Sequence, residues 1–415
     1  MKNKYKMRIS FLGILEYIWA LILVLDGNSV YHALANKSFH FSLVFAFLSC
    51  VLCLYSKNVF KKDLFSMIIL WVYSLVYLLF CRTGILYEEF LTMFIGTLPP
   101  LYVVFKSKMR ENKQNELLYK VEIVVVILSS AAFVIWLLSL FRFINPNMFV
   151  TINWGHIKSV NGFFGLLFQI QRDDTFGIPY YRNTGFFCEG PMMSLWLVLS
   201  LMIECFLKEK SNNKVIVWLM IVICTTFASS GIICGAACII AKICVSIIDD
   251  RKMSKKIVVF LLLMPFILLL GLYFAMFIVN LKKNTISFAM RYQDYLAGII
   301  VWKHYPIFGS GFGNLASLSP YVYSANNDLI NDFGYSNSIM AVMATSGVWG
   351  MLLYYTPVIV YLTNSLKMKK WRNVAFSLIY VMLFILIIFF ARQISVVMLA
   401  YMLAHISTNK KVRKL

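Results

Sequence analysis

The chain has 415 residues, of which 60% are hydrophobic and 14% are charged, and its mean hydropathy is +0.76. Soluble domains carry about 25% charged residues, so this composition excludes an ordinary soluble globular protein. The net charge of +21 would suit a nucleic-acid partner. However, no basic segment is combined with base-stacking aromatic residues in a soluble stretch, so we expect no nucleic acid.

Long apolar segments recur along the whole chain. Their length, roughly 17 to 25 residues, is what a helix needs to cross the hydrocarbon core of a bilayer. Helices also satisfy their own backbone hydrogen bonds there. The sequence therefore predicts an all-α, polytopic protein in the lipid bilayer, with one transmembrane domain over residues 1–415. About twelve spans are expected, near residues 9–26, 39–56, 64–81, 85–105, 121–141, 191–207, 215–230, 231–248, 257–281, 338–362, 374–391 and 393–407.

The basic residues mark one side of this membrane domain. When the loops are assigned alternately to the two sides, 27 of the 39 Lys and Arg residues fall on the side of the first residue. They lie in the segments 2–8, 57–62, 106–120, 208–214, 251–256, 367–372 and 410–414. Positively charged loops remain in the cytoplasm. We therefore expect a multi-pass protein of the cytoplasmic membrane with both termini in the cytoplasm.

Two loops on the other side are too long to be simple connections. They span residues 142–190 and 282–337 and are rich in aromatic residues. Loops of this length are usually functional or disordered, and the aromatic content favours folded structure at the membrane surface, which we expect to be partly helical. The stretch 163–170 is too short to span the bilayer and is predicted to be re-entrant or interfacial.

The first outer loop ends in a charged motif that runs directly into a span. Pro191 suits the first turn of a helix, where its missing N–H costs nothing. Glu189 would then lie at the positive end of that helix. The planar fork of Arg182 is well shaped to bind phosphate, although a lone arginine near lipid headgroups is also a common interfacial anchor.

Between the two outer loops, Gly231 and Gly235 form a small-xxx-small pair that favours close packing of helices. Glu16 and Glu204 lie within or at the ends of spans, where a structural or snorkelling role is the preferred interpretation. The nine cysteines show no disulfide or metal-ligand spacing. We therefore expect no metal and no other cofactor.

The second outer loop carries further polar residues. Arg291 and Asp294 are spaced to pair on one face of a helix. Lys303 and His304 precede a turn that runs from Pro306 to Gly313 and includes Gly309 and Gly311. Such glycines allow tight turns and close approach to a ligand. The pattern is neither a dinucleotide-binding nor a P-loop fingerprint.

The order of these motifs resembles the O-antigen ligase and polysaccharide polymerase (Wzy-type) family of bacterial membrane glycosyltransferases. The first family motif is similar to Arg182, Gly185, Phe187 and Glu189, with Gly190 inserted before Pro191. The second is similar to Arg291 and the segment 306–313, and Asn337 keeps the asparagine of a closing His-Asn pair. Ser336 stands where ligases of the family have the histidine. The arginine of a Ser-Arg-Gly element is also absent at 229–231.

The resemblance implies a polymerase in the bacterial cytoplasmic membrane that moves a growing O-antigen, capsular or exopolysaccharide chain. The donor would be an undecaprenyl-diphosphate-linked oligosaccharide, and the acceptor a lipid-linked repeat unit on the outer side of the membrane. A chain-length regulator and a flippase of the same pathway would be partners. Arg182 and Arg291 would bind the diphosphate and Glu189 would be the base. Additional substrate contacts would come from Asp294, Lys303, His304, Gly311, Gly313 and Asn337.

Three alternatives stay open at this point. A ligase would transfer finished polymer to a different acceptor, and Ser336 disfavours it. A flippase or exporter of the same lipid-linked glycan would share the membrane and the charge pattern, but two long aromatic outer loops are unusual for a transporter built from inverted repeats. A receptor or assembly subunit without catalytic activity would not need the arginine motifs.

Overall fold

The computed structural model describes residues 11–35, 40–81, 84–154, 156–173, 180–249, 286–321, 335 and 337–406. The predicted span 257–281 lies outside these residues. Within them the chain is mostly helical, and each of the other predicted spans contains a helix. Six helices are long and apolar enough to cross a membrane: Lys61–Phe80, Tyr87–Arg110, Glu116–Leu140, Gly190–Leu207, Ser229–Ile248 and Ser338–Lys367. The chain is a multi-pass membrane protein, and the predicted total of about twelve spans stays a prediction.

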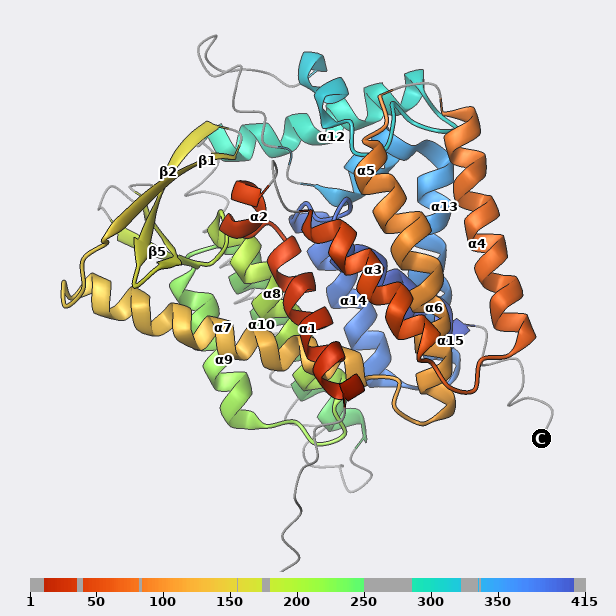
Figure 1. Cartoon of the computed structure of the whole chain (residues 1–415), viewed down its shortest axis with the longest axis horizontal. Helices are drawn as coiled ribbons and strands as arrows, with labels where there is room; N and C mark the ends of the chain where they lie inside the picture. Colours follow the sequence, from red (N-terminus) through yellow and green to blue (C-terminus); the bar gives the residue numbers. More distant parts are fainter. Residues whose placement is uncertain are drawn as a thin grey trace, which may run out of the picture.

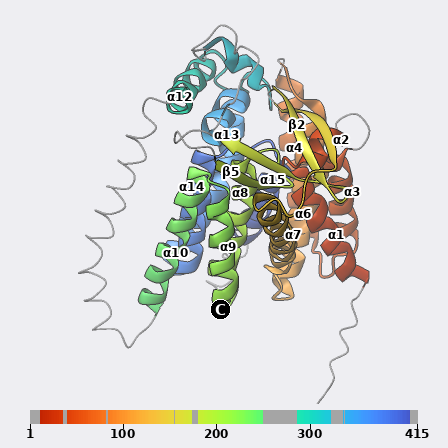
Figure 2. The ribbon, with the colours of Figure 1, turned by 90° about the vertical axis from the view of Figure 1, so that its left-hand side faces the viewer.

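Most of the helices lie side by side as a bundle, whereas α7 runs across them (Figure 1). In chain order they are α1 (Phe11–Asp26), α2 (Val30–Ala35), α3 (Phe41–Leu54), α4 (Lys61–Phe80), α5 (Tyr87–Phe90), α6 (Leu98–Arg110), α7 (Glu116–Leu140), α8 (Gly190–Met202), α9 (Asn213–Thr225), α10 (Ser229–Asp249), α12 (Ile286–His304), α13 (Ser338–Lys367), α14 (Trp371–Leu386) and α15 (Gln393–Ile406). Figure 2 shows α12 lying across one end of the bundle.

The core is built around α8 and α15, which are buried along almost their whole lengths. Helix α8 contacts α7, α9, α10 and α14, whereas α15 contacts α6 and α13. Gly231 lets α10 approach α8 closely, because a Cβ at this glycine would lie 2.3 Å from the Cβ of Ser194. By contrast, α4 is largely exposed. An apolar helix that is exposed at the edge of a bundle is suited to contact lipid.

Two helices depart from regular α-helix where the sequence contains Pro or Gly. The segment η1 (Leu91–Thr97) is π-helical and leads into α6, which begins at Leu98 and continues through Pro99 and Pro100. Each proline lacks the N–H of a regular turn, and the chain passes from π-helical to α-helical hydrogen bonding just before this proline pair. Helix α13 is broken at Gly347, whose φ is 58° and ψ is −154°.

The first outer loop contains strands, so the prediction that it is partly helical is wrong. Strands β1 (Met148–Trp154), β2 (His156–Phe163) and β3 (Leu166–Leu167) form one antiparallel sheet, and β4 (Gln169–Asp173) and β5 (Tyr180–Gly185) form a second. The stretch 163–170, predicted to be re-entrant or interfacial, belongs to these strands. Phe163 and Phe168 pack inside, with their ring centroids 6.1 Å apart, whereas Phe164 is exposed. The described part of the second outer loop contains α12 and the short helix η3 (Leu315–Tyr321).

We call the end of the bundle with β1–β5 and α12 the loop end, and the opposite end, which carries Lys57, Lys108, Lys208 and Lys369, the basic end. The buried acids of the basic end are paired. Glu16 accepts from Lys108 at 2.7 Å and also pairs with Lys120. Glu122 and Glu204 share Lys208, at 2.7 and 2.5 Å. These pairs support the structural role expected for Glu16 and Glu204.

Candidate functional site

The first predicted motif lies at the loop end, where β5 leads into α8. Arg182 is half-buried on β5, opposite Gln171 of β4. Gly185 then turns the chain with a φ of 56°, and a Cβ there would lie 3.1 Å from both Ala132 and Met193. Glu189 is the N-cap residue of α8, with Pro191 in the first turn. The predicted position of this carboxylate at the positive end of a helix is therefore confirmed.

The connection between α1 and α2 is joined to this motif by backbone hydrogen bonds. The N–H of Val30 donates to the carbonyl of Phe186 at 2.8 Å, and the N–H of Cys188 donates to the carbonyl of Asn28 at 3.1 Å. The residues that flank this connection therefore lie beside Glu189, although they are more than 150 residues away in the chain.

A buried charged cluster flanks the same connection. The carboxylate of Asp26, which is 1% exposed, accepts a hydrogen bond from Ser42 at 2.5 Å and lies 3.6 Å from the ring of His32. The guanidinium of Arg392 lies 3.3 Å from the other ring nitrogen of His32. Burial and the positive charge of Arg392 lower the pKa of His32 to about 4, so its ring is neutral at physiological pH.

Arg392 ends an irregular segment, residues 387–392, of which residues 387–391 were predicted as the end of the span 374–391. Helix α14 ends at Leu386, and the N–H of Ile387 still donates to the carbonyl of Leu383 at 2.9 Å. Beyond it the helical hydrogen bonds end, although Ile387, Phe389 and Phe390 are buried. Side-chain hydroxyls replace those bonds. Ser338 donates to the carbonyl of Ile387 and accepts from the N–H of Phe389, and Tyr354 donates to the carbonyl of Phe390. Irregular backbone at membrane depth is tolerated when the surrounding protein satisfies it in this way.

The last residue of the second motif, Asn337, lies at the loop end, where α13 begins. Asn337 caps this helix by accepting from the N–H of Met340 at 3.2 Å. Its neighbour Ser338 holds the segment 387–392. Two buried amides here have polar atoms with no hydrogen-bond partner among the described residues: the Nδ2 of Asn337 and both side-chain atoms of Gln393. Ser336 lies outside the described residues.

Helix α12 carries the other predicted residues of the second loop. Asp294 is buried, and its backbone carbonyl accepts a hydrogen bond from the hydroxyl of Tyr335 at 2.6 Å. Burial and the nearby Asp294 raise the pKa of Tyr335. Lys303 and His304 are exposed at the C-terminal end of the helix, where His304 stacks against Tyr321. Arg291 is on the same helix, and its side chain is outside what the structure describes.

The glycine turn is packed tightly against the broken helix α13. Gly309, Gly311 and Gly313 all have positive φ, at 71°, 106° and 77°. A Cβ on Gly309 would lie 2.2 Å from the backbone carbon of Thr345. The turn donates the N–H of Ser310 to Ala344, and α13 donates the N–H of Val348 and Trp349 back to Pro306 and Ile307. These glycines therefore have a clear packing role, and the predicted contact of Gly311 and Gly313 with substrate stays a prediction.

The sequence reasoning missed Asp26, His32, Arg392 and Gln393 as site residues. A signal for two of them was present: Asp26 closes the first span and Arg392 is a lone cation between the last two spans, both on the side with few basic residues. Nothing in the sequence signals that these residues lie close together in the fold. Among the described residues, no group of three or more His, Cys, Asp and Glu side chains is arranged to hold a metal ion.

A comparison with known families identifies the central part of this chain. Residues 215–355 match the family model described as O-antigen ligase. This chain carries an O-antigen ligase family domain. The domain contains Arg291, Asp294 and Asn337 together with the glycine turn, whereas Arg182 and Glu189 precede it. No curated protein matches the chain. The match is consistent with the O-antigen ligase and Wzy-type family, and over residues 215–355 it confirms the resemblance inferred from the motifs.

Proposed function

We propose that the protein is a polysaccharide polymerase that transfers a growing glycan from undecaprenyl diphosphate to a lipid-linked repeat unit. The reaction would take place at the loop end, on the outer side of the membrane. The observation that carries this proposal is the convergence at the loop end of Glu189, the start of α13 and the segment that holds Arg392. These parts come from three distant regions of the chain, and they meet where a membrane-bound donor and a polar acceptor would have access.

The proposed chemistry is a displacement at the anomeric carbon of the donor glycan. The acceptor hydroxyl forms the new glycosidic bond while the bond between the sugar and the diphosphate breaks. Glu189 accepts the hydroxyl proton as general base, a role that contributes roughly 100-fold or more to such reactions. Arg182 and Arg291 bind the departing diphosphate, whose negative charge grows in the transition state. Arg392 adds a third cation at this end.

The unsatisfied amides of Asn337 and Gln393 support a polar ligand. An unpaired buried amide costs about 1–3 kcal/mol, and sugar hydroxyls supply the donors and acceptors that would satisfy both groups. Asp294, Lys303, His304, Gly311 and Gly313 remain proposed substrate contacts along the same end. The chain-length regulator and the flippase of the pathway remain proposed partners.

A ligase is the second candidate, because the family description itself names that activity. We favour the polymerase because Ser336 stands in place of the histidine that the resemblance assigns to ligases. The two differ in acceptor: another lipid-linked repeat unit for a polymerase, and a different acceptor molecule for a ligase.

The test is the size distribution of lipid-linked and surface glycans after deletion of the gene and complementation with variants. A polymerase predicts single repeat units on the outer side of the membrane, and restored long chains with the intact gene. Arg182→Ala and Glu189→Gln should each reduce polymer at least about 100-fold. The matched controls are Arg172→Ala, on the neighbouring strand, and Glu88→Gln, since both residues are exposed.

The remaining outcomes separate the alternatives. Long polymer retained on the carrier would show a ligase, and repeat units trapped inside the cell would show a flippase or exporter. Normal polymer with both Arg182→Ala and Glu189→Gln, at normal protein level, would contradict the assignment of the site.

A further inference from the structure

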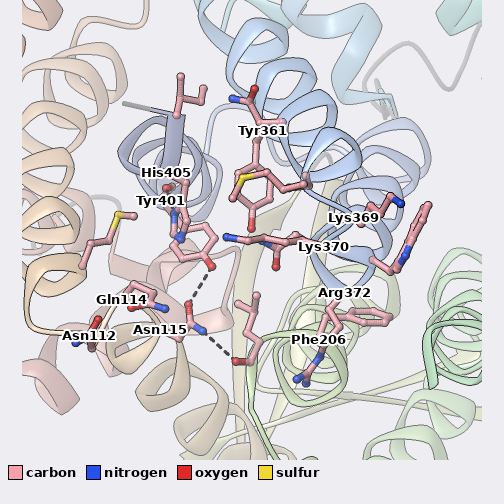
Figure 3. A pocket seen from close by; sticks show the side chains of 18 residues that line it. Asn112, Gln114, Asn115, Phe206, Tyr361, Lys369, Lys370, Arg372, Tyr401 and His405 are labelled. Carbon is pink, nitrogen blue, oxygen red and sulfur yellow. Dashed lines mark hydrogen bonds between the residues drawn. The ribbon is translucent and has the colours of Figure 1, made fainter. Parts of the chain in front are cut away.

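A cavity of about 590 Å³ lies at the basic end, away from the proposed transfer site. It is bounded by the connection between α6 and α7, the end of the π-helical segment η2 (Ile203–Leu207), the turn between α13 and α14, and the end of α15. Figure 3 shows the lining side chains from these elements around a common space. The volume is in the range of pockets that hold small ligands.

The lining is positively charged. Its residues are Met109, Asn112, Gln114, Asn115, Phe206, Leu207, Tyr361, Asn364, Ser365, Met368, Lys369, Lys370, Trp371, Arg372, Asn373, Tyr401, His405 and Ile406. This set includes Lys369, Lys370 and Arg372 but no Asp or Glu. Figure 3 shows Lys370 extending across the cavity toward Tyr401.

Within the described residues, no acid at the basic end forms an ion pair with these cations. Glu16 and Glu116 pair with Lys108 and Lys120, and Glu122 and Glu204 pair with Lys208. Within the described part of the chain, Lys369 and Lys370 form no ion pair, and Arg372 donates only to the backbone carbonyls of Cys205 and Lys208. The positive charge of the cavity is therefore available to a ligand.

The wall of the cavity is also held in place. The side-chain N–H₂ of Asn115 donates to the carbonyl of Leu207 at 2.9 Å, and its oxygen accepts from the hydroxyl of Tyr401 at 2.9 Å. The buried ring of Tyr401 packs against His405, with ring centroids 4.3 Å apart. In the parts of the chain described, the side-chain amides of Asn112, Gln114 and Asn364 have no hydrogen-bond partner, so they add donors to the cations.

We propose that this cavity binds a phosphate-bearing anion that enters from the basic side of the membrane. Clustered cations with amide donors and no carboxylate match phosphate chemistry, and basic pockets between transmembrane helices on the cytoplasmic side bind anionic lipid headgroups. The phosphate belongs either to an anionic phospholipid of that leaflet or to a soluble phosphorylated compound. The site lies at the opposite end from the proposed transfer reaction and does not depend on it.

The experiment uses the full-length protein purified in detergent. Native mass spectrometry measures retention of phosphatidylglycerol against phosphatidylcholine, and a thermal-shift series measures the effect of inorganic phosphate. The test variant is K369Q/K370Q. The matched control is K61Q/K62Q, which removes two exposed lysines at the same end but outside the cavity. K369R/K370R keeps the charge and should keep the binding.

We expect wild-type protein and K61Q/K62Q to bind alike, and K369Q/K370Q to bind about tenfold more weakly. A preference for phosphatidylglycerol that is lost in K369Q/K370Q identifies the lipid as the source. A shift with inorganic phosphate without lipid preference identifies a soluble compound. The proposal is wrong if neither probe distinguishes wild type from K369Q/K370Q, or if K61Q/K62Q loses binding equally.

Discussion

At the scale of single residues, the loop end is distinguished by charges that the fold buries together. Isolated buried charges are strongly unfavourable, so proteins retain them when they are paired or functional. Asp26 is surrounded by the hydroxyl of Ser42, the backbone N–H of Gln393 and the positive charge of Arg392. This arrangement holds the cation near the buried carboxylate of Asp26, which is therefore not left unpaired.

His32 makes the stability of the loop end sensitive to pH. Its pKa is about 4 in the folded chain and about 6.5 when unfolded. Between these values the unfolded chain binds more protons, so stability contributed by the neutral ring is lost as the pH falls from about 6.5 toward 4. Relative to His32→Gln, the wild type should lose about 2 kcal/mol between pH 7 and 4.5.

Denaturant unfolding of the purified protein at several pH values measures this difference. His40→Gln is the matched control, because His40 is exposed at the same end and pairs with Glu88 at 2.5 Å. Parallel pH profiles for the wild type and His32→Gln would show that the ring does not contribute.

At the scale of elements, the glycine turn and the broken helix α13 depend on each other. The turn supplies an N–H to α13 and receives two in return, which satisfies backbone groups that a helix break would otherwise leave unpaired. Residues with side chains cannot approach this closely. The Pro-x-x-Gly-x-Gly-x-Gly pattern therefore positions the second loop on the bundle, whatever contact it makes with substrate.

Gly309→Ala should destabilise the protein more than Gly165→Ala. Both glycines have positive φ, at 71° and 78°, so both substitutions strain the backbone by about 1–2 kcal/mol. The alanine Cβ at position 309 also collides with α13, whereas at position 165 no atom lies within 4 Å. Thermal unfolding in detergent measures both variants. Equal losses would mean that the close approach does not matter.

Lys208 connects α7 to the end of the α8–η2 helix through Glu122 and Glu204. Removing the shared cation leaves two buried carboxylates, so Lys208→Met should cost about 3 kcal/mol or more. Lys210→Met serves as the control because Lys210 is exposed two residues away. The measurement is the midpoint of denaturant unfolding. A loss in Lys208→Met no larger than in the control would contradict a structural role for this pair.

At the scale of the whole molecule, the two ends of the bundle differ in structure and in charge. The loop end has the strands, α12 and the converging polar residues, and the basic end has the paired acids and the cationic cavity. The positive-inside rule predicts that the basic end faces the cytoplasm. The proposed reaction requires this orientation, because the lipid-linked substrates are expected on the outer side.

Cysteine labelling in a variant whose nine native cysteines are replaced tests the orientation. In intact cells a membrane-impermeant maleimide should label Ser319→Cys at the loop end, and it should label Lys61→Cys only after the membrane is permeabilised. Both positions are exposed. The reverse pattern would place the loop end in the cytoplasm and would exclude the proposed outer reaction.

The sequence by itself was sufficient for the membrane helices, because apolar length and charge asymmetry are properties of local segments. It was also sufficient to place Glu189 at the start of α8, since Pro191 marks a first helical turn. The family resemblance could be found from the sequence because each of its motifs is a short contiguous segment. The first outer loop was predicted incorrectly. Its strands depend on pairing between segments, as in the register of β4 with β5, and local aromatic content does not report that pairing.

The tertiary structure alone decided which residues share the loop end. Residues 387–391 were predicted to be apolar helix. In the structure, the hydroxyls of Ser338 and Tyr354 hydrogen-bond to the backbone of this segment and hold Arg392 near Asp26. The cavity at the basic end likewise arises from four segments, and its lysines, Lys369 and Lys370, come from one of them and look like ordinary topology signals. In both cases the chemistry comes from contacts between residues far apart in the chain, and these form only when the helices pack.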